Sequence, residues 1–249
     1  MGFICIRKFY CTFAVYRFLE MRNILGVLFF CLSALCVAQP KTIETVFVKA
    51  DSLYREDQFY LGLTYNRLLK TPMNIVQNGL SIGVNTGFLR DFPINKSRTF
   101  AIAAGLGFSY NKYHQNLGVF KTGEGFDYEV LDNASFDRNK LEQVSIEIPI
   151  EFRWRNSTPT RHRFFRIYGG FKCSYLVFNK TKFVGSSSEV TINNSDFNTF
   201  QYGPTLSLGY NTWNLHAYYG LNPVFKSAVL NSSNIQMSTL NLGIIFYIL

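Results

Sequence analysis

Residues 144–154 read VSIEIPIEFRW, and this stretch decides the fold. Every second residue is bulky and apolar, whereas the residues between are small, polar or charged. Side chains alternate between the two faces of a β-strand, so the pattern predicts a strand with one apolar face and one charged face. Its length matches the roughly 9–11 residues with which a tilted strand crosses a bilayer.

The same alternation recurs along the chain. Seven further segments carry it: 59–69, 79–89, 99–113, 165–178, 200–210, 213–221 and 239–249. In hydrocarbon every backbone N–H and C=O must be paired internally, which only helices and closed barrels achieve. The sequence therefore predicts an all-β protein, an antiparallel up-and-down transmembrane β-barrel of about eight strands over residues 58–249.

Composition and loop lengths favour a barrel over a soluble β-sandwich. The chain has 25 Phe and 15 Tyr, and only 16% of its residues are charged. After Val37 no apolar stretch is long enough for a membrane helix, which needs about 20 residues. Short connections (90–98, 155–163, 211–212) alternate with longer ones, as the periplasmic turns and external loops of outer-membrane barrels do. This predicts an integral outer-membrane protein with both termini in the periplasm.

The N-terminal region has the pattern of an export signal. Residues 21–40 read MRNILGVLFFCLSALCVAQP, a basic start, an apolar core and a small residue at the expected cut. We expect initiation at Met21, cleavage after Ala38, and a short periplasmic leader over 39–57. Residues 1–38 are then an upstream extension and signal peptide. Lipidation at Cys36 is an alternative, which Leu35 before it disfavours.

The mature chain offers little for cofactor chemistry. Once residues 1–38 are removed Cys173 is the one cysteine left, so we expect no internal disulfide and no cysteine metal cluster. The net charge of the whole chain is +9, but its Lys and Arg are scattered, which does not indicate nucleic-acid binding. We expect no cofactor and no metal, and the sequence identifies no small-molecule substrate.

Four segments carry a family resemblance. They are DSLYREDQFYLGLTYNRLL (Asp51–Leu69), GFLRDFPIN (Gly87–Asn95), AIAAGLGFSYN (Ala101–Asn111) and SIEIPIEFRW (Ser145–Trp154). Together they resemble the PorT-like outer-membrane β-barrel proteins of Bacteroidetes-type bacteria. The resemblance implies a small barrel, and its namesake is an accessory of type IX protein secretion. Fold alone does not transfer that task.

Charged residues on the inward face form the first candidate site. Parity places four of them and one tyrosine in the lumen: Glu147, Glu151, Arg166, Lys172 and Tyr168. Pairing about the 155–163 turn sets Glu147 opposite Lys172 and Glu151 opposite Tyr168. Buried charges persist when they are paired. We interpret the set as a structural plug, with an ion path as the alternative.

A basic turn forms the second candidate site. Arg153, Arg155, Arg161 and Arg163 are expected to lie at the periplasmic interface beside Trp154. Arginines there can reach lipid phosphates, or they can form a docking surface for an acidic periplasmic partner.

The remaining polar features are less specific. The 112–142 loop is acidic and could bind divalent cations that bridge lipopolysaccharide, or it could simply be solvated. His114 near a loop could serve a hydrolase, but no serine flanks it at strand spacing. His162 falls in the basic turn and His216 on the lumen face, where ordinary packing is expected.

The sequence therefore predicts a non-catalytic barrel, a structural or accessory subunit of an outer-membrane complex in protein secretion or barrel assembly. Its expected partners are outer-membrane lipid, lipopolysaccharide and outer-membrane or periplasmic proteins. The alternatives are a surface-recognition or adhesion barrel with long external loops and a narrow small-solute channel.

Overall fold

The computed structural model describes residues 57–123, 125–132, 135–156, 165–185, 189–210 and 212–248. The expected signal peptide, nearly all of the leader, and Arg161 and Arg163 lie outside these ranges. Strands are the regular elements of the described part: β1 Asp57–Leu69, β2 Ile82–Pro93, β3 Phe100–His114, β4 Leu117–Lys121, β5 Phe126–Val130, β6 Arg138–Arg155, β7 Phe165–Val184, β8 Glu189–Ile192, β9 Phe200–Tyr210, β10 Trp213–Tyr219, β11 Val229–Leu230, β12 Ser233–Asn234 and β13 Ser238–Ile248.

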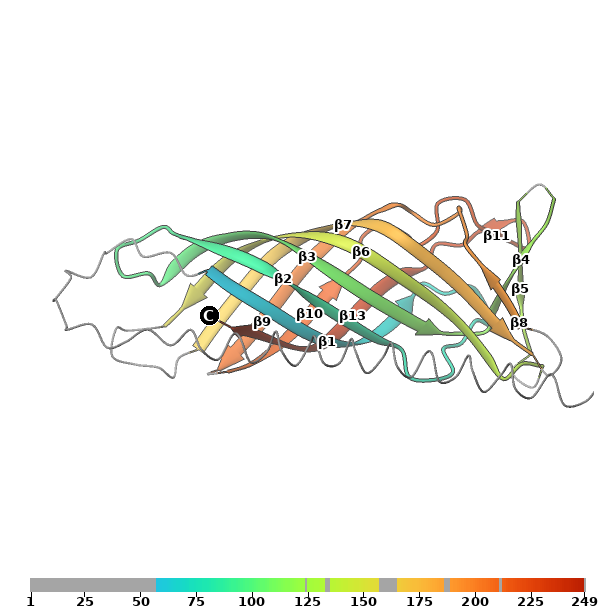
Figure 1. Ribbon diagram of the computed structural model, residues 1–249, viewed down its shortest axis with the longest axis horizontal. Coiled ribbons are helices and arrows are strands. Elements are labelled where there is room, and N and C mark those ends of the chain that lie inside the picture. Colours follow the sequence, from blue (N-terminus) through green and yellow to red (C-terminus); the bar gives the residue numbers. More distant parts are fainter. Residues whose placement is uncertain are drawn as a thin grey trace, which may run out of the picture. The chain divides into compact units, whose positions relative to one another are not determined.

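Eight of these strands close into a barrel. They pair antiparallel in the order β1–β2–β3–β6–β7–β9–β10–β13, and β13 returns to β1, with Phe59 opposite Ile248. Figure 1 shows the tilted strands wrapping around one axis. The predicted fold class and strand count are confirmed. None of the described residues belongs to a helix long and apolar enough to cross a membrane.

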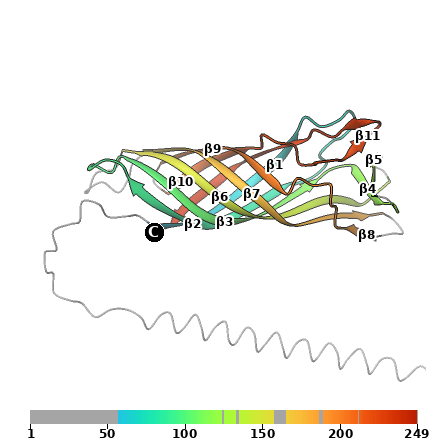
Figure 2. The ribbon, with the colours of Figure 1, turned by 90° about the horizontal axis from the view of Figure 1, so that it is seen from above.

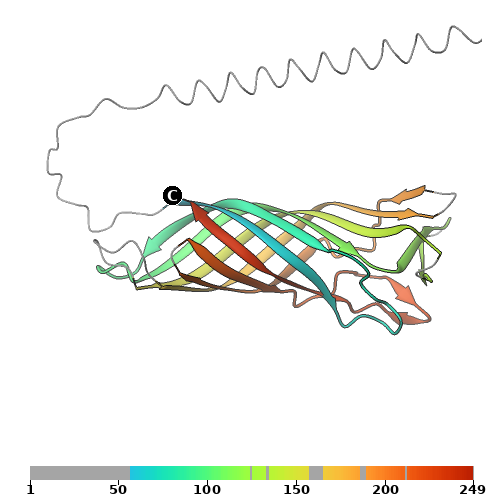
Figure 3. The ribbon, with the colours of Figure 1, turned by 90° about the horizontal axis from the view of Figure 1, so that it is seen from below.

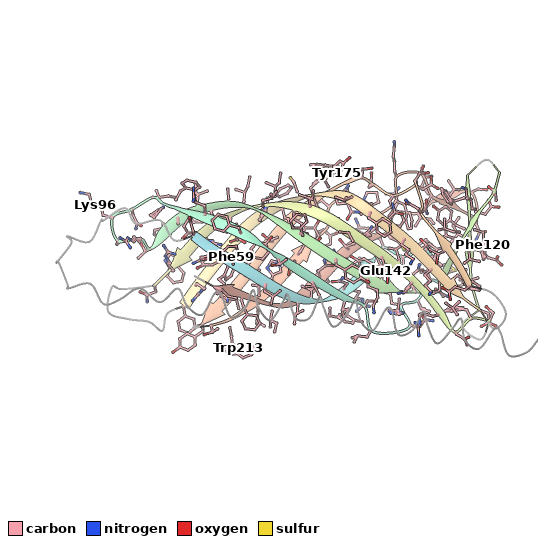
Figure 4. All side chains as sticks on the ribbon, in the orientation of Figure 1. Phe59, Lys96, Phe120, Glu142, Tyr175 and Trp213 are labelled. Atoms are coloured by element: carbon pink, nitrogen blue, oxygen red, sulfur yellow. The ribbon has the colours of Figure 1, made fainter. Side chains whose placement is uncertain are left out.

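The barrel is apolar on its outside. On β6 the outward residues from Val144 to Trp154 are at least partly exposed, whereas the inward residues between them are buried. Phe59 is 62% exposed and Trp213 is 64% exposed. Exposure of such large apolar side chains would be unfavourable if this wall faced water. Figure 4 shows both at the wall, toward the end that carries Lys96. This outer wall is suited to hydrocarbon, and the charged face is turned inward.

The two ends of the barrel differ. The end of β2, the start of β3, the end of β9 and the start of β10 lie at the end where β1 begins and β13 stops, which we call the short-turn end. Connections of 12 or more residues join the strands at the opposite, long-loop end. The β4–β5 hairpin, β8 and the β11–β12 hairpin gather at this end in both side views (Figures 2 and 3).

Two strands reach further than the sequence pattern predicted. β6 begins at Arg138 and β7 continues to Val184, so both enter segments expected to be loops. The expected register between them was also wrong by two residues: Glu147 lies opposite Ser174 and Glu151 opposite Gly170. The turn between these strands starts after Arg155 and ends before Phe165, which shifts the pairing. A shift of two leaves every side chain on its predicted face.

A compact apolar cluster lies at the long-loop end, and we call it and the loops around it the long-loop cap. Its members come from the long loops and from the barrel strands β1, β3, β6 and β7, and all are nearly inaccessible to solvent: Leu68, Ile75, Tyr113, Leu117, Leu141, Leu176, Phe197, Val224, Phe225, Ala228, Leu230, Ile235 and Met237. Tyr128 and Val130 of β5 pack against them. The long loops therefore pack on the barrel strands around one shared apolar core.

Gly243 of β13 allows a close approach of neighbouring backbone. A Cβ at this position would lie 1.9 Å from the carbonyl oxygen of Leu63 and 2.6 Å from Cα of Thr64. Both atoms are backbone, so the β1–β13 pairing would have to open. We expect Gly243→Ala to lower the free energy of unfolding by about 1–3 kcal/mol, as overpacking does. Urea titration of the barrel refolded into vesicles measures this change.

Gly169 of β7 supplies the matched control. A Cβ there would meet nothing within 4 Å. Gly169→Ala should therefore leave the urea midpoint close to that of the parent chain. Equal midpoints for the two variants would contradict the close approach at Gly243.

Candidate functional site: the filled lumen and the long-loop cap

Two arginines and two carboxylates form a buried cluster in the lumen. Arg153 Nε donates to Glu151 Oε2 at 2.9 Å, and Nη1 donates to Gln58 Oε1 at 2.9 Å and to Asp91 Oδ1. Arg155 Nη1 donates to Asp91 Oδ2 at 2.8 Å. One carboxylate, Asp91, thus holds both guanidinium groups. The four charges cancel, which is the condition under which buried ions are tolerated.

Aromatic rings complete this cluster. The Arg153 guanidinium lies 4.6 Å from the ring centroid of Tyr168 and 5.1 Å from that of Tyr247. The two rings also meet edge to face at 5.4 Å. Cation–π contacts of this kind are strongest where water is excluded. Strands β1, β2, β6, β7 and β13 all contribute, so the cluster ties most of the barrel's circumference together.

The structure corrects the prediction for the basic turn. Arg153 and Arg155 are 0% and 2% exposed and point into the lumen, so neither is available to lipid phosphates or to an acidic partner. The physical reason is Asp91, which was expected in a turn and instead continues β2 on the inward face, with 0% exposure. Extending the alternation of β2 by two residues would have found it.

A second ion pair lies further along the lumen. Lys172 Nζ is 2.8 Å from Glu147 Oε1, and it also lies 4.3 Å from the ring centroid of Tyr218. Of the five predicted lumen residues, Glu147 and Lys172 therefore meet each other, whereas Glu151 and Tyr168 meet Arg153. Arg166 is partly exposed near the short-turn end, opposite Arg155.

Polar side chains fill the lumen toward the cap. Thr64 Oγ1 donates to Asn66 Oδ1 at 2.8 Å, and Asn66 Nδ2 donates to Asn111 Oδ1 at 2.9 Å. A cavity of about 10 Å³ beside Thr64, Lys172 and His216 has room for about one water molecule. Side chains therefore occupy the lumen along its length.

His216 forms a pair with a serine that sequence reasoning did not single out. Ser207 Oγ and His216 Nδ1 are 2.8 Å apart. Both residues are buried, at 2% and 6% exposure, and the adjoining cavity is too small for a substrate. Nucleophilic catalysis needs a reacting group within reach of the hydroxyl, so this pair packs the lumen.

His114 lies at the long-loop end of β3. Ser81 is beside it, but the Ser81 hydroxyl accepts a hydrogen bond from the backbone N–H of His114 at 2.9 Å. Across the described ranges, no three His, Cys, Asp or Glu side chains are grouped to hold a metal ion.

A network of side-chain hydrogen bonds joins the loops of the long-loop cap. Tyr128 donates to Asp196 Oδ2 at 2.9 Å, Asn194 Nδ2 donates to the Tyr128 hydroxyl at 2.8 Å, and Ser227 donates to Asp196 Oδ1 at 3.0 Å. Burial, and then the Asp196 carboxylate, raise the pKa of Tyr128, which keeps its hydroxyl as a donor. The rings of Phe225 and Phe197 also contact each other, with their centroids 4.6 Å apart. Three loops are thereby held in one arrangement.

The comparisons with known proteins agree with this geometry. Residues 37–226 match the family model described as outer membrane protein beta-barrel domain. The chain belongs to this family. It is an integral outer-membrane β-barrel. No curated protein matches it.

Solved structures similar to this outer-membrane barrel are distant. Ail, the attachment invasion locus protein of Yersinia pestis, is 12% identical over 77% of this chain and 97% of its own, with a TM-score of 0.28. A triple mutant of the Rhodopseudomonas blastica porin is 8% identical over 78% of this chain and 100% of its own, with a TM-score of 0.19. Neither likeness is strong enough to say what this barrel does.

Proposed function

We propose that this barrel is a non-catalytic structural or accessory subunit of an outer-membrane complex, and that its long-loop cap is the surface that meets the partner. The observation that carries the proposal is the filled lumen beneath a cap whose loops pack around one apolar core. A barrel whose lumen is filled and whose loops are rigid is suited to binding a partner. Preordered loops lose little conformational entropy when a partner docks.

The lumen argues against the small-solute channel. The Arg153 cluster, the Glu147–Lys172 pair and the amides near the cap occupy successive parts of it. An eight-stranded barrel is only wide enough to hold such side chains. A steady single-channel conductance in planar bilayers would contradict this closed lumen.

Exposed apolar residues on the cap support a protein partner. Met73 is 86% exposed, and Val76 and Val229 are each 46% exposed, in segments outside the barrel strands. Apolar side chains that face water beyond the hydrocarbon band favour a protein contact. A cavity of about 340 Å³ between Met73 and the β11–β12 hairpin adds a concave part to this surface.

The class of complex follows from the resemblance to PorT-like barrels, which suggests protein secretion of the type IX kind, with barrel assembly as the other candidate. In this proposal the short-turn end faces the periplasm with both termini, and the cap faces outward, as in other outer-membrane barrels. Recognition of an external ligand by the 340 Å³ cavity is the second candidate function.

A photo-crosslinking residue at Met73 tests the proposal in native membranes. We expect illumination to join Met73→photo-crosslinker chains to one or a few outer-membrane proteins, which also co-purify with the parent chain after gentle detergent extraction. The matched control is Leu215, which is 66% exposed on the lipid-facing wall and should give no protein adduct. A lone barrel without adducts at Met73 or Val76 would reject the accessory role and favour external recognition.

A further inference from the structure

One side of the barrel projects beyond its apolar band. β3, β6 and β7 have 15, 18 and 20 residues, whereas β9, β10 and β13 have 11, 7 and 11. The longer strands continue toward the long-loop end, as Figure 1 shows for β6 and β7. Their outward residues change character along this extension.

The register shows where the change occurs. Tyr110, Val144 and Phe178 lie side by side on β3, β6 and β7 and form the last apolar row. Two residues further, Lys112, Glu142 and Lys180 form the next row, and then His114, Lys140 and Lys182. Directly paired residues project from the same face of a sheet. We call these last two rows, with Arg138, the cation rows.

Positive charge dominates the cation rows. Lys140 and Lys182 are paired with Glu142 and Glu189. In the described part of the chain, the other three cations have no carboxylate within ion-pair distance: Lys112, Arg138 and Lys180. The hydrogen bond from Lys182, with charge from Lys180 and Arg138, lowers the pKa of Glu189, which reflects the positive field.

Aromatic side chains lie on the outer wall next to the cation rows. Tyr110 and Phe178, in the adjacent row, are 37% and 48% exposed, and Tyr175, one row further, is 55% exposed. Figure 4 places Glu142 beyond Tyr175 in the direction of Phe120, at the long-loop end. This order, apolar wall, aromatic edge and then cations, matches an amphiphile whose acyl chains lie along the wall and whose anionic headgroup sits above it.

The arrangement is concentrated on one side. β9, β10 and β13 contain no Lys or Arg, and β1 has one outward cation at this end, Arg67. Cations that served only to reach the nearest lipid headgroups would be expected around the whole rim. Their concentration on three neighbouring strands favours one lipid held at one place.

We propose that the cation rows bind the phosphate groups of a phosphorylated glycolipid of the outer leaflet, of the lipid A kind, with its acyl chains along β3, β6 and β7. This inference rests on the proposed outward direction of the long-loop end. Lys112, Arg138 and Lys180 supply the unmatched charge, and Tyr110 and Phe178 contact the first part of the acyl chains. Contacts between ammonium or guanidinium groups and phosphate are charge-assisted and strong.

Native mass spectrometry of the full-length barrel with bisphosphorylated lipid A tests the proposal. We expect the parent chain to retain the lipid, and the triple variant K112Q/R138Q/K180Q to bind it roughly tenfold to a hundredfold more weakly. Removal of the phosphates from lipid A should weaken binding to the parent chain by a similar factor. Unfolding only on heating in SDS gels verifies that the variant is folded.

The control removes the same charge at the same end of the barrel. R67Q/K70Q/K226Q changes three exposed cations outside the cation rows and should bind lipid A as the parent does. Equal losses in the two triple variants, or equal binding of phosphatidylglycerol or of dephosphorylated lipid A, would overturn the proposal. Because the assay uses purified barrel without other proteins, its failure is distinct from a failure to crosslink a partner through Met73.

Discussion

Replacing Arg153 by alanine should lower the free energy of unfolding of the barrel by about 3–5 kcal/mol. The substitution removes the only guanidinium that contacts both Asp91 and Glu151 in the described lumen, and it leaves Glu151 buried without a cation partner. An unpaired carboxylate away from water must either protonate or admit water. Loss of the ring contacts with Tyr168 and Tyr247 adds to the cost. Urea unfolding from vesicles, followed by tyrosine and tryptophan fluorescence, measures the change.

Arg90 offers a matched comparison on the outside of the same barrel. It forms a bidentate pair with Asp57, at 2.7 and 2.8 Å, but the two side chains are 46% and 40% exposed. Exposed ion pairs contribute about 1 kcal/mol or less. Arg90→Ala should therefore change stability far less than Arg153→Ala. If the two variants unfolded at the same urea concentration, the lumen cluster would not be the stabilising plug described above.

Replacing Phe225 by alanine should open the long-loop cap while leaving the barrel closed. Phe225 is 2% exposed and contacts the rings of Phe197 and Tyr128 at 4.6 and 5.6 Å. Removing a buried phenyl ring costs about 3–5 kcal/mol, which is comparable to the stability of a cluster this small. Amide hydrogen exchange over 115–137, 185–199 and 220–237 should accelerate by two or more orders of magnitude.

The barrel strands report separately on this variant. Exchange in β1, β2 and β13 should stay slow, because their ladder hydrogen bonds do not depend on the cap. Val229→Ala, at a 46% exposed position in the same segment, should leave cap exchange near that of the parent chain. Unchanged loop exchange in Phe225→Ala would show that the loops are not held by this core.

Much of the wall could be predicted residue by residue. The alternation from Val144 to Trp154 assigned each side chain to its face, and the structure keeps Glu147 and Glu151 inward and Phe152 outward. This succeeds because a side chain's face depends only on counting along one strand. The error of two residues in the β6–β7 register did not disturb that assignment.

The partners of the buried charges could not be predicted in the same way. Arg153 was expected at the membrane interface because it adjoins a turn rich in arginine, yet it pairs with Asp91, 62 residues away. That pairing depends on how far β2 runs past its apolar residues and on the curvature of the closed wall. The local sequence pattern of β2 or β6 indicates neither the length of β2 nor the curvature of the wall.

The sequence by itself determined a barrel of eight tilted strands with an apolar outside and a charged inside, because a period of two residues is a local property of an extended chain. The tertiary structure decided which charges meet in the lumen, and that Tyr128, Asp196 and Phe225 join three loops into a cap. Those contacts depend on closure of the barrel and on packing between segments far apart in the chain. A sequence period describes positions along one strand, so it does not give the distance between such segments.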